Sequence, residues 1–262
     1  MANQSNLKLG IIGAGFVGGS VIAGFNKNVE QFVVDTKLNT NTVDDLIAFE
    51  PSITFVCVPT AQQETHDDCD VSIVRQVLSD LYDRDYKGIV VIKSTITPKH
   101  LTQMKKDFGV KIVYNPEFLT EADSNKEFCH QKFAIFGGHH CRSWYELYIN
   151  SGIKIDKVRF TSMKNAAYAK YTINSFLATK VIFFNELYNM YCNDGFDELT
   201  ELVAMDERIG KSHMTVPGHD REFGFGGMCL PKDTLAFATS ASRKGSPLKL
   251  LEEAILINKE IR

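Results

Sequence analysis

The pattern of apolar positions divides the chain into two parts. In the first part, short apolar runs alternate with segments whose apolar residues recur every three or four positions, as Val74, Leu78 and Leu81 do. Strands that alternate with helices predict an α/β fold with a Rossmann-like, doubly wound parallel sheet. The predicted strands are 7–12, 31–34, 53–58, 88–93, 111–114 and 133–136.

The second part has a helical pattern. Thr161 and Ser162 can cap a helix that continues to Asn193-Asp194-Gly195, over roughly 30 residues or about 45 Å. Its apolar residues point in more than one direction, so we expect burial on several sides and a second subunit as partner. The expected organisation is a Rossmann-like domain, residues 1–160, and an all-helical central domain, residues 161–262, that forms a homodimer through the long helix.

A glycine motif follows the first predicted strand. GxGxxG between a strand and a helix is the context in which this motif binds a dinucleotide, because the glycines let the backbone approach a pyrophosphate at the helix N-terminus. The second strand ends in Asp35, and a carboxylate there suits the ribose hydroxyls of NAD and repels the extra phosphate of NADP. The predicted NAD contacts are Gly13, Gly15, Phe16, Val17, Gly18, Asp35 and Lys37.

Two alternatives stay open at this motif. Asp35 can instead cap the end of its strand, and Lys37 leaves some use of NADP possible.

Polar residues follow the ends of the later strands. In a parallel sheet the carboxyl ends of the strands meet at one edge, where ligands bind. Each residue alone can equally be a helix cap or a turn residue, but together they outline a cleft. They are Thr60, Ser94, Thr95 and Glu117.

The loop FGFGGMCLPKDT, residues 223–234, sets one cysteine directly before a predicted helix. Pro231 suits the first helical position, so Cys229 lies where backbone N–H groups and the helix dipole favour a thiolate. The glycines before it leave room for a substrate to approach the backbone. A buried, unreactive cysteine is the alternative.

Lys170 and Asn174 lie four residues apart on the long helix, hence on one face, among apolar neighbours. A buried lysine needs an anionic partner, and a developing oxyanion would serve. The alternative is a lysine that extends to solvent beside a structural asparagine.

Composition fits a globular enzyme. The 262 residues are 44% hydrophobic and 23% charged, and a net charge of −3 gives no electrostatic case for binding nucleic acid or an anionic membrane. No apolar run is long enough to span a membrane and the first residues lack a signal peptide, so we expect a cytosolic protein with reduced thiols. We read His139-His140 as a surface turn and predict no metal site.

Six segments, in this order, resemble the UDP-glucose/GDP-mannose dehydrogenase family. They are VCVPT (56–60), KSTITP (93–98), NPEFLTEA (115–122), AKYTINSFLATKVIFFNE (169–186), RIG (208–210) and GFGGMCLPKD (224–233). The resemblance implies oxidation of the primary alcohol of a nucleotide sugar to a carboxylate with two NAD+ and no metal. UDP-glucose is the expected substrate, with UDP-N-acetylmannosamine and GDP-mannose as alternatives.

The resemblance also implies roles for individual residues. Cys229 is the nucleophile, Lys170 and Asn174 stabilise an oxyanion, and Asp233 orients or activates water. Further catalytic positions, around that water and the reacting sugar, are Thr95, Glu117 and Glu121. Further cofactor contacts are Thr60, Thr95, Glu121 and Lys232. Residues that bind the substrate are Phe118, Leu119, Thr120, Glu121, Lys170, Asn174, Arg208, Phe225 and Gly226, of which Arg208 is expected to reach the site of the neighbouring subunit.

The chain departs from the family pattern in three places. A third, nucleotide-binding domain would begin just after Arg262, so we expect a short form or a fragment. Residues 216–222 lengthen the approach to the glycine loop, and Thr120 stands where many members have arginine. A simple two-electron dehydrogenase and a non-catalytic nucleotide-binding remnant therefore stay as alternative functions.

Overall fold

A computed structural model describes residues 7–25, 29–61, 69–119, 124–139, 141–191 and 195–262. The described chain forms two compact units. Unit 1 contains the residues up to Ala61 together with Asp70–Lys170, and unit 2 contains Cys69 and Tyr171–Arg262. The domain boundary expected near Phe160 stays a prediction.

Unit 1 is built on a seven-stranded sheet of order β2-β1-β3-β4-β5-β7-β9. The first five strands are parallel, and the chain reverses its direction across the sheet between β1 and β3. The Rossmann-like fold class is confirmed, and the predicted bounds of β1 and β5 agree with the structure. The strands are β1 (Leu7–Ile12), β2 (Val29–Val34), β3 (Ile53–Val56), β4 (Ile89–Ile92), β5 (Lys111–Tyr114), β7 (Ala134–Gly137) and β9 (Val158–Thr161), with β6 (His130–Gln131) and β8 (Lys154–Ile155) in a separate two-stranded sheet.

The sheet is mostly parallel, as expected, and the exception is the junction between β5 and β7. The last strand, β9, was not among the predicted strands. β7 runs antiparallel to β5 and meets it through one pair, Tyr114 with Gly137, and β9 then runs parallel to β7. A Cβ on Gly137 would lie 2.9 Å from the Cβ of Ala166 and 3.2 Å from the Tyr114 carbonyl oxygen, so glycine permits this junction. Apolar runs predict that a strand exists but do not fix its direction.

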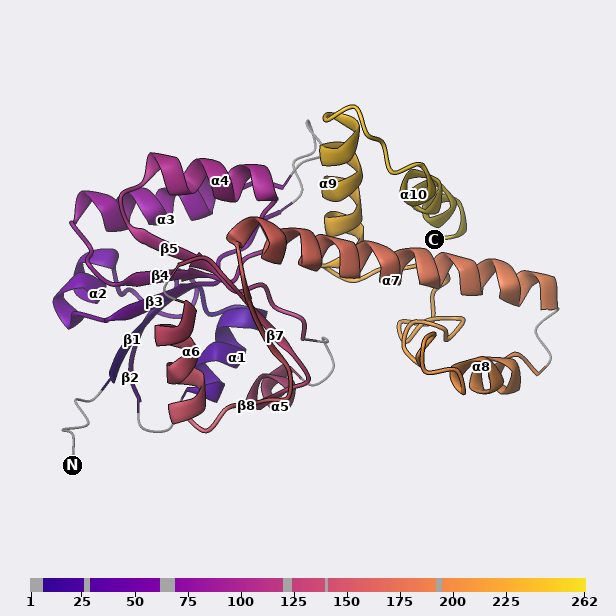
Figure 1. The fold of residues 1–262 in the computed structure, drawn as a ribbon, viewed down its shortest axis with the longest axis horizontal. Helices are drawn as coiled ribbons and strands as arrows, with labels where there is room; N and C mark the ends of the chain where they lie inside the picture. The colour runs from indigo at the N-terminus through magenta and orange to yellow at the C-terminus, as the bar shows by residue number, and fades with distance from the viewer. Residues whose placement is uncertain (1–6, 26–28, 62–68, 120–123, 140, 192–194) are drawn as a thin grey trace. The chain divides into compact units, whose positions relative to one another are not determined.

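Helices cover both faces of the sheet. α1 (Phe16–Gly24) and α6 (Cys141–Asn150) lie on one face, and α3 (Ser72–Asp83) and α4 (Pro98–Asp107) lie on the other (Figure 1). The core under α1, α5 (Ser124–Cys129) and α6 is rich in aromatic rings, and the ring centroids of Phe25 and Tyr148 are 5.0 Å apart. Such edge-to-face contacts fix the helices against the sheet.

The long predicted helix is α7 (Met163–Tyr191), and its expected end at residues 193–195 falls mostly outside the described residues. Unit 2 adds α8 (Phe196–Ala204), α9 (Leu230–Ser242) and α10 (Lys249–Ile261) to the part of α7 that begins at Tyr171. Two small cores hold these helices against α7, one around Phe184 and Phe196 and the other around Ile182 and Phe225. Among the described residues, no helix combines the length and apolar character that a membrane crossing requires.

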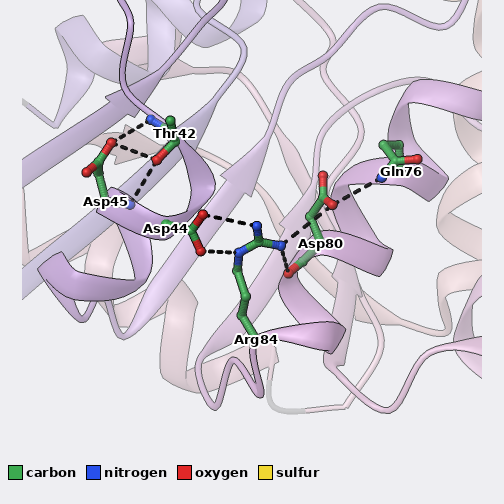
Figure 2. Close-up of polar contacts among 6 residues, drawn as sticks. All are labelled: Thr42, Asp44, Asp45, Gln76, Asp80 and Arg84. Carbon is green, nitrogen blue, oxygen red and sulfur yellow. Dashed lines mark hydrogen bonds and ion pairs between the residues drawn. The ribbon is translucent and has the colours of Figure 1, made fainter.

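Polar contacts fix α2 (Val43–Phe49) beside α3. Arg84, at the end of α3, donates from Nε and Nη2 to the two carboxylate oxygens of Asp44 at 2.6 and 3.1 Å (Figure 2). These hydrogen bonds hold the pKa of Asp44 below its usual value. At the start of α2, Thr42 and Asp45 form a capping box, in which each side chain accepts the backbone N–H of the other.

We predict that Thr42→Ala lowers the free energy of unfolding by about 1 kcal/mol, because one N–H in the first turn of α2 loses its acceptor. Urea denaturation followed by circular dichroism measures the change. Thr40→Ala is the matched control, since Thr40 is exposed and no hydrogen bond of its side chain is found in the described structure. Equal effects of the two substitutions would contradict the prediction.

Candidate active site

The glycine motif forms a tight turn between β1 and α1. Gly13 has φ +92°, and a Cβ there would lie 2.8 Å from the carbonyl oxygen of Cys57. A Cβ on Gly18 would lie 1.9 Å from the carbonyl oxygen of Gly13, closer than any side chain can come. Both positions therefore need glycine to pack the helix against β1 and β3.

Gly15 has a different environment, because a Cβ built on it meets no atom within 4 Å. It is the N-cap of α1, and Phe16 and Val17 form the first helical turn, where backbone N–H groups have no partner within the helix. An open position above a helix N-terminus is the feature that a pyrophosphate needs. The residues present therefore fit the dinucleotide predicted from the sequence.

Asp35 links the end of β2 to this turn. Its Oδ2 accepts the N–H of Ala14 at 2.7 Å, and its Oδ1 accepts the N–H groups of Lys37 and Leu38. The bonds from Ala14 and Lys37 hold the pKa of Asp35 below its usual value, so the side chain is ionised at neutral pH. Asp35 thus caps its turn, as the alternative interpretation expected, and keeps a half-exposed carboxylate beside the glycine turn.

Polar side chains join the carboxyl ends of β3 and β4. The hydroxyl of Thr60 donates to the carbonyl of Thr95 at 2.9 Å, and Ser94 donates to the carbonyl of Val58 at 2.6 Å. These residues lie at the same edge as the glycine turn, since their strands are parallel to β1. The structure therefore brings the predicted Thr60, Ser94 and Thr95 together.

Glu117 lies in the loop after β5, in a buried polar network that the sequence did not reveal. The Nζ atom of Lys93 is 2.8 Å from Oε2 of Glu117, and the two side chains are 1% and 10% exposed. Nζ also donates to Oδ1 of Asn115 at 2.8 Å, and the hydroxyl of Tyr148 donates to the same oxygen at 2.8 Å. Lys93 and Asn115 belong to two of the six family motifs quoted above. Their place in these motifs is the feature of the sequence that could have indicated a role for them.

The chain after Glu117 turns toward α7. Oε1 of Glu117 accepts the N–H of Phe118 at 2.9 Å, and the ammonium group of Lys170 lies 5.3 Å from the centre of the Phe118 ring. Leu119 is half-buried against the aromatic core. The predicted positions Thr120 and Glu121 lie outside the described residues.

In unit 2, Cys229 is the N-cap of α9 and is exposed. The helix begins at Leu230, so Pro231 occupies the second helical position, one later than expected. Cys229 therefore lies at the N-terminal end of the helix dipole, which favours a negative charge, although its side chain does not accept a capping hydrogen bond from the first turn. By contrast, burial raises the pKa of Cys57 to about 12, so that thiol stays protonated at neutral pH.

Asp233 lies one turn after Cys229 and is fully buried. Its Oδ2 accepts Nδ2 of Asn174 at 2.6 Å, and its Oδ1 lies 2.5 Å from Nζ of Lys232. The structure thus joins the three predicted residues Asn174, Lys232 and Asp233. On α7, Lys170 stands one turn before Asn174, and both are buried, at 6% exposure.

The glycine loop before Cys229 is held by asparagines from two helices, which the sequence analysis missed. Asn258 of α10 accepts the N–H of Phe225 at 2.6 Å and donates to its carbonyl at 3.1 Å. Asn185 of α7 accepts the N–H of Gly224 at 3.0 Å. A Cβ on Gly226 would lie 2.1 Å from the guanidinium group of Arg262. The predicted Phe225 and Gly226 are therefore part of a fixed loop.

Arg208 lies on a loop that a buried lysine stabilises. The side chain of Arg208 is 88% exposed and pairs with Asp206 at 2.5 Å. Beneath it, Nζ of Lys180 donates to the carbonyls of Ile209, Gly210 and Ser212 at 2.6–3.0 Å, and burial lowers the pKa of this lysine. The guanidinium group therefore extends from a fixed turn.

Two family models match the chain. The NAD binding domain of the UDP-glucose/GDP-mannose dehydrogenase family matches residues 23–148, and the central domain of the same family matches residues 164–260. Together they account for most of the chain.

Curated relatives have names from this family. UDP-glucose 6-dehydrogenase of Rickettsia bellii is 31% identical over 66% of this chain and 41% of its own length. UDP-glucose 6-dehydrogenase TuaD of Bacillus subtilis is 29% identical over 89% of this chain and 52% of its own length. The chain thus spans about half the length of these relatives.

Solved structures share the fold. A UDP-glucose dehydrogenase from Pyrobaculum islandicum superposes with a TM-score of 0.82 at 21% identity, covering 99% of this chain and 70% of that one. A 3-hydroxyisobutyrate dehydrogenase from Mycobacterium tuberculosis superposes with a TM-score of 0.76 at 15% identity, covering 97% and 93%. The two family matches agree with the six motifs and with the fold, and the chain belongs to the UDP-glucose/GDP-mannose dehydrogenase family.

Proposed function

We propose that this chain oxidises the C6 alcohol of a nucleotide sugar to a carboxylate, with UDP-glucose as the substrate and a thioester on Cys229 as intermediate. The observation that carries the proposal is the exposed thiol at the N-cap of α9, one turn before a buried Asp233 that Asn174 and Lys232 hold in place. The names of the curated relatives favour UDP-glucose.

The glycine turn of unit 1 is the proposed cofactor site. The N–H groups at the start of α1 and the open space at Gly15 suit the pyrophosphate, and Asp35 suits the ribose hydroxyls. NAD+, when bound there, accepts a hydride in each of the two oxidations. Thr60 and Thr95 at the same edge, and Lys232 of unit 2, are further proposed contacts.

The thiolate of Cys229 acts on the aldehyde left by the first oxidation. Sulfur donates an electron pair to the aldehyde carbon, a carbon–sulfur bond forms, and the carbonyl oxygen becomes an oxyanion. Lys170 and the amide of Asn174 are the proposed stabilisers of this oxyanion, since an ammonium group and an amide N–H both favour a developing negative charge. Loss of a hydride from the adduct then leaves a thioester.

Asp233 and Glu117 are proposed to orient the water that cleaves the thioester. Water oxygen adds to the thioester carbon, and its two protons pass to solvent. The carbon–sulfur bond breaks, and Cys229 regains its thiolate while the sugar leaves as a carboxylate. Asp233 is suited to this role because both its oxygens are held by donors, which fixes the carboxylate.

Counting NADH tests the proposal against the two alternatives. We expect two NADH per UDP-glucose consumed, whereas a simple two-electron dehydrogenase gives one and a non-catalytic remnant gives none. Cys229→Ala should reduce acid formation by at least about a thousandfold, because no nucleophile retains the aldehyde. Cys229→Ser should accumulate a sugar ester detected by intact mass, since oxygen is a poorer leaving group than sulfur. Acid formation at the normal rate by Cys229→Ala would contradict the covalent mechanism.

For the cofactor, we predict that NAD+ binds at least about tenfold more tightly than NADP+, because the ionised Asp35 repels a 2′-phosphate. Asp35→Ala should reduce this preference, as measured by titration calorimetry with each cofactor. Glu30→Ala, in the exposed part of β2, is the matched control. Equal affinities in the unmodified chain would disprove the assignment.

We also propose a homodimer through α7. Three large apolar side chains, Phe176, Phe183 and Met190, recur every seven residues on this helix and are 67%, 60% and 72% exposed. Side chains seven apart lie on one helical face, so these three form an apolar stripe along the helix. A second copy of this stripe is its proposed partner, with Arg208 reaching the neighbouring site.

Phe183→Glu should raise the dimer dissociation constant at least about tenfold, since it places charge at the centre of the stripe. Analytical ultracentrifugation measures the change. Ile73→Glu, at an exposed apolar position of α3, should leave the mass unchanged. A wild-type chain that sediments as a monomer, or a dimer that Phe183→Glu does not weaken, would exclude this interface.

A further inference from the structure

In the buried network around Glu117, Lys93 and Asn115 have no part in the reaction steps described above. Lys93 directly follows β4, and its side chain is one of the least exposed among the described residues. Among the described residues, its ammonium group lies 2.8 Å from the Glu117 carboxylate, 2.8 Å from Oδ1 of Asn115 and 5.4 Å from the centre of the Phe128 ring. A buried charge of this kind is held in one position.

Asn115 fixes the position of the Lys93 ammonium group, because hydrogen bonds determine which end of the Asn115 amide is the oxygen and which is the nitrogen. Its Oδ1 accepts from Lys93 and Tyr148, and its Nδ2 donates to the carbonyl of Ile135 at 2.9 Å. Burial raises the pKa of Tyr148 well above its usual value, so its hydroxyl stays protonated and remains a donor. The amide therefore cannot rotate without losing hydrogen bonds in the interior.

On the other side of Lys93, the network ends at two proposed site residues. Oε1 of Glu117 accepts the N–H of Phe118, whose ring faces the ammonium group of Lys170. Oε2 is buried 2.8 Å from Lys93, but at an angle that is not that of a hydrogen bond, and it has no hydrogen-bond donor among the described residues. A buried acceptor without a donor is rare in folded proteins, and a bound water or a hydroxyl of a ligand would supply that donor.

Stability does not explain this arrangement. Replacing a buried ion pair with apolar residues of similar size is often neutral or stabilising, whereas removing one partner alone is costly. Oε2 of Glu117 can still accept a hydrogen bond from another donor. This arrangement indicates that the orientation of the Glu117 carboxylate matters for the site.

We propose that Lys93 is a positioning residue that holds the Glu117 carboxylate so that Oε2 can accept a hydrogen bond from the water or sugar hydroxyl at the reacting carbon. This proposal rests on the proposed function. Asn115 and Tyr148 support Lys93 in this role, and the same contacts place Phe118 beneath Lys170.

Kinetics of four variants test the proposal: Lys93→Met, Glu117→Gln, the double variant, and Lys99→Met as a matched control on the exposed side of α4. Lys93→Met should lower kcat for acid formation by on the order of 10- to 100-fold and change KM for the sugar less than about threefold. In the double variant the melting temperature should recover, because no unpaired charge stays buried, while kcat stays low. A recovered kcat in the double variant would overturn the proposal.

Amide hydrogen exchange gives a measurement that does not need activity. In Lys93→Met the Phe118 N–H should exchange at least about tenfold faster relative to the Cys57 N–H, which bonds to Ile12 within the sheet. Unchanged exchange at Phe118 would overturn the proposal. If the wild-type chain makes no acid while Phe118 still responds, the proposed function fails and the positioning of Glu117 stands.

Tyr148→Phe is the alternative test variant if Lys93→Met does not fold. It removes one hydrogen-bond donor from Asn115 and keeps the ion pair between Lys93 and Glu117. We then expect a smaller increase in Phe118 exchange, about threefold, with the same direction in kcat. No change in either quantity would count against the network.

Discussion

The close approach of Gly13 and Gly18 is the constraint on which unit 1 depends. With no Cβ at either position, the turn after β1 packs against the backbone at the end of β3, and α1 starts directly above the sheet edge. That placement directs the N–H groups at the start of α1 toward the carboxyl edge of the sheet, where the loops after β3, β4 and β5 begin. A side chain at Gly18 would displace the helix and with it the anion-binding end.

Each unit contains a buried charged group that is held by hydrogen bonds and an ion pair. In unit 1, Lys93 is surrounded by Glu117, Asn115 and an aromatic ring, and in unit 2 Asp233 is held between Asn174 and Lys232. Such groups cost free energy to bury, and the cost is offset only when geometry and hydrogen bonds are good. Each therefore fixes one arrangement of the loop that carries it, which is the property a reactive site needs.

Local features could be predicted from the sequence, whereas features that depend on which strands and helices become neighbours could not. The N-cap position of Cys229 and the bounds of β1 follow from residues close in sequence. The reversed direction of β7 does not, because an apolar run has no direction. The ion pair between Lys93 and Glu117 forms only when β4 lies beside β5. The hydrogen bonds between Asn258 and Phe225 form only when α10 lies beside the glycine loop. Composition alone indicates neither contact.

The three hydrogen bonds from Lys180 bear on the entropy of ligand binding. Because its ammonium group donates hydrogen bonds to the carbonyls of Ile209, Gly210 and Ser212, the backbone of this turn is ordered when the chain folds. In the proposed role of Arg208, a ligand that contacts its guanidinium group has to immobilise only one side chain rather than a whole loop. Immobilising a backbone residue costs about 1–2 kcal/mol, so a turn of four residues shaped in advance removes several kcal/mol from the cost of recognition. Lys180 thus favours binding by a ligand that it does not need to touch.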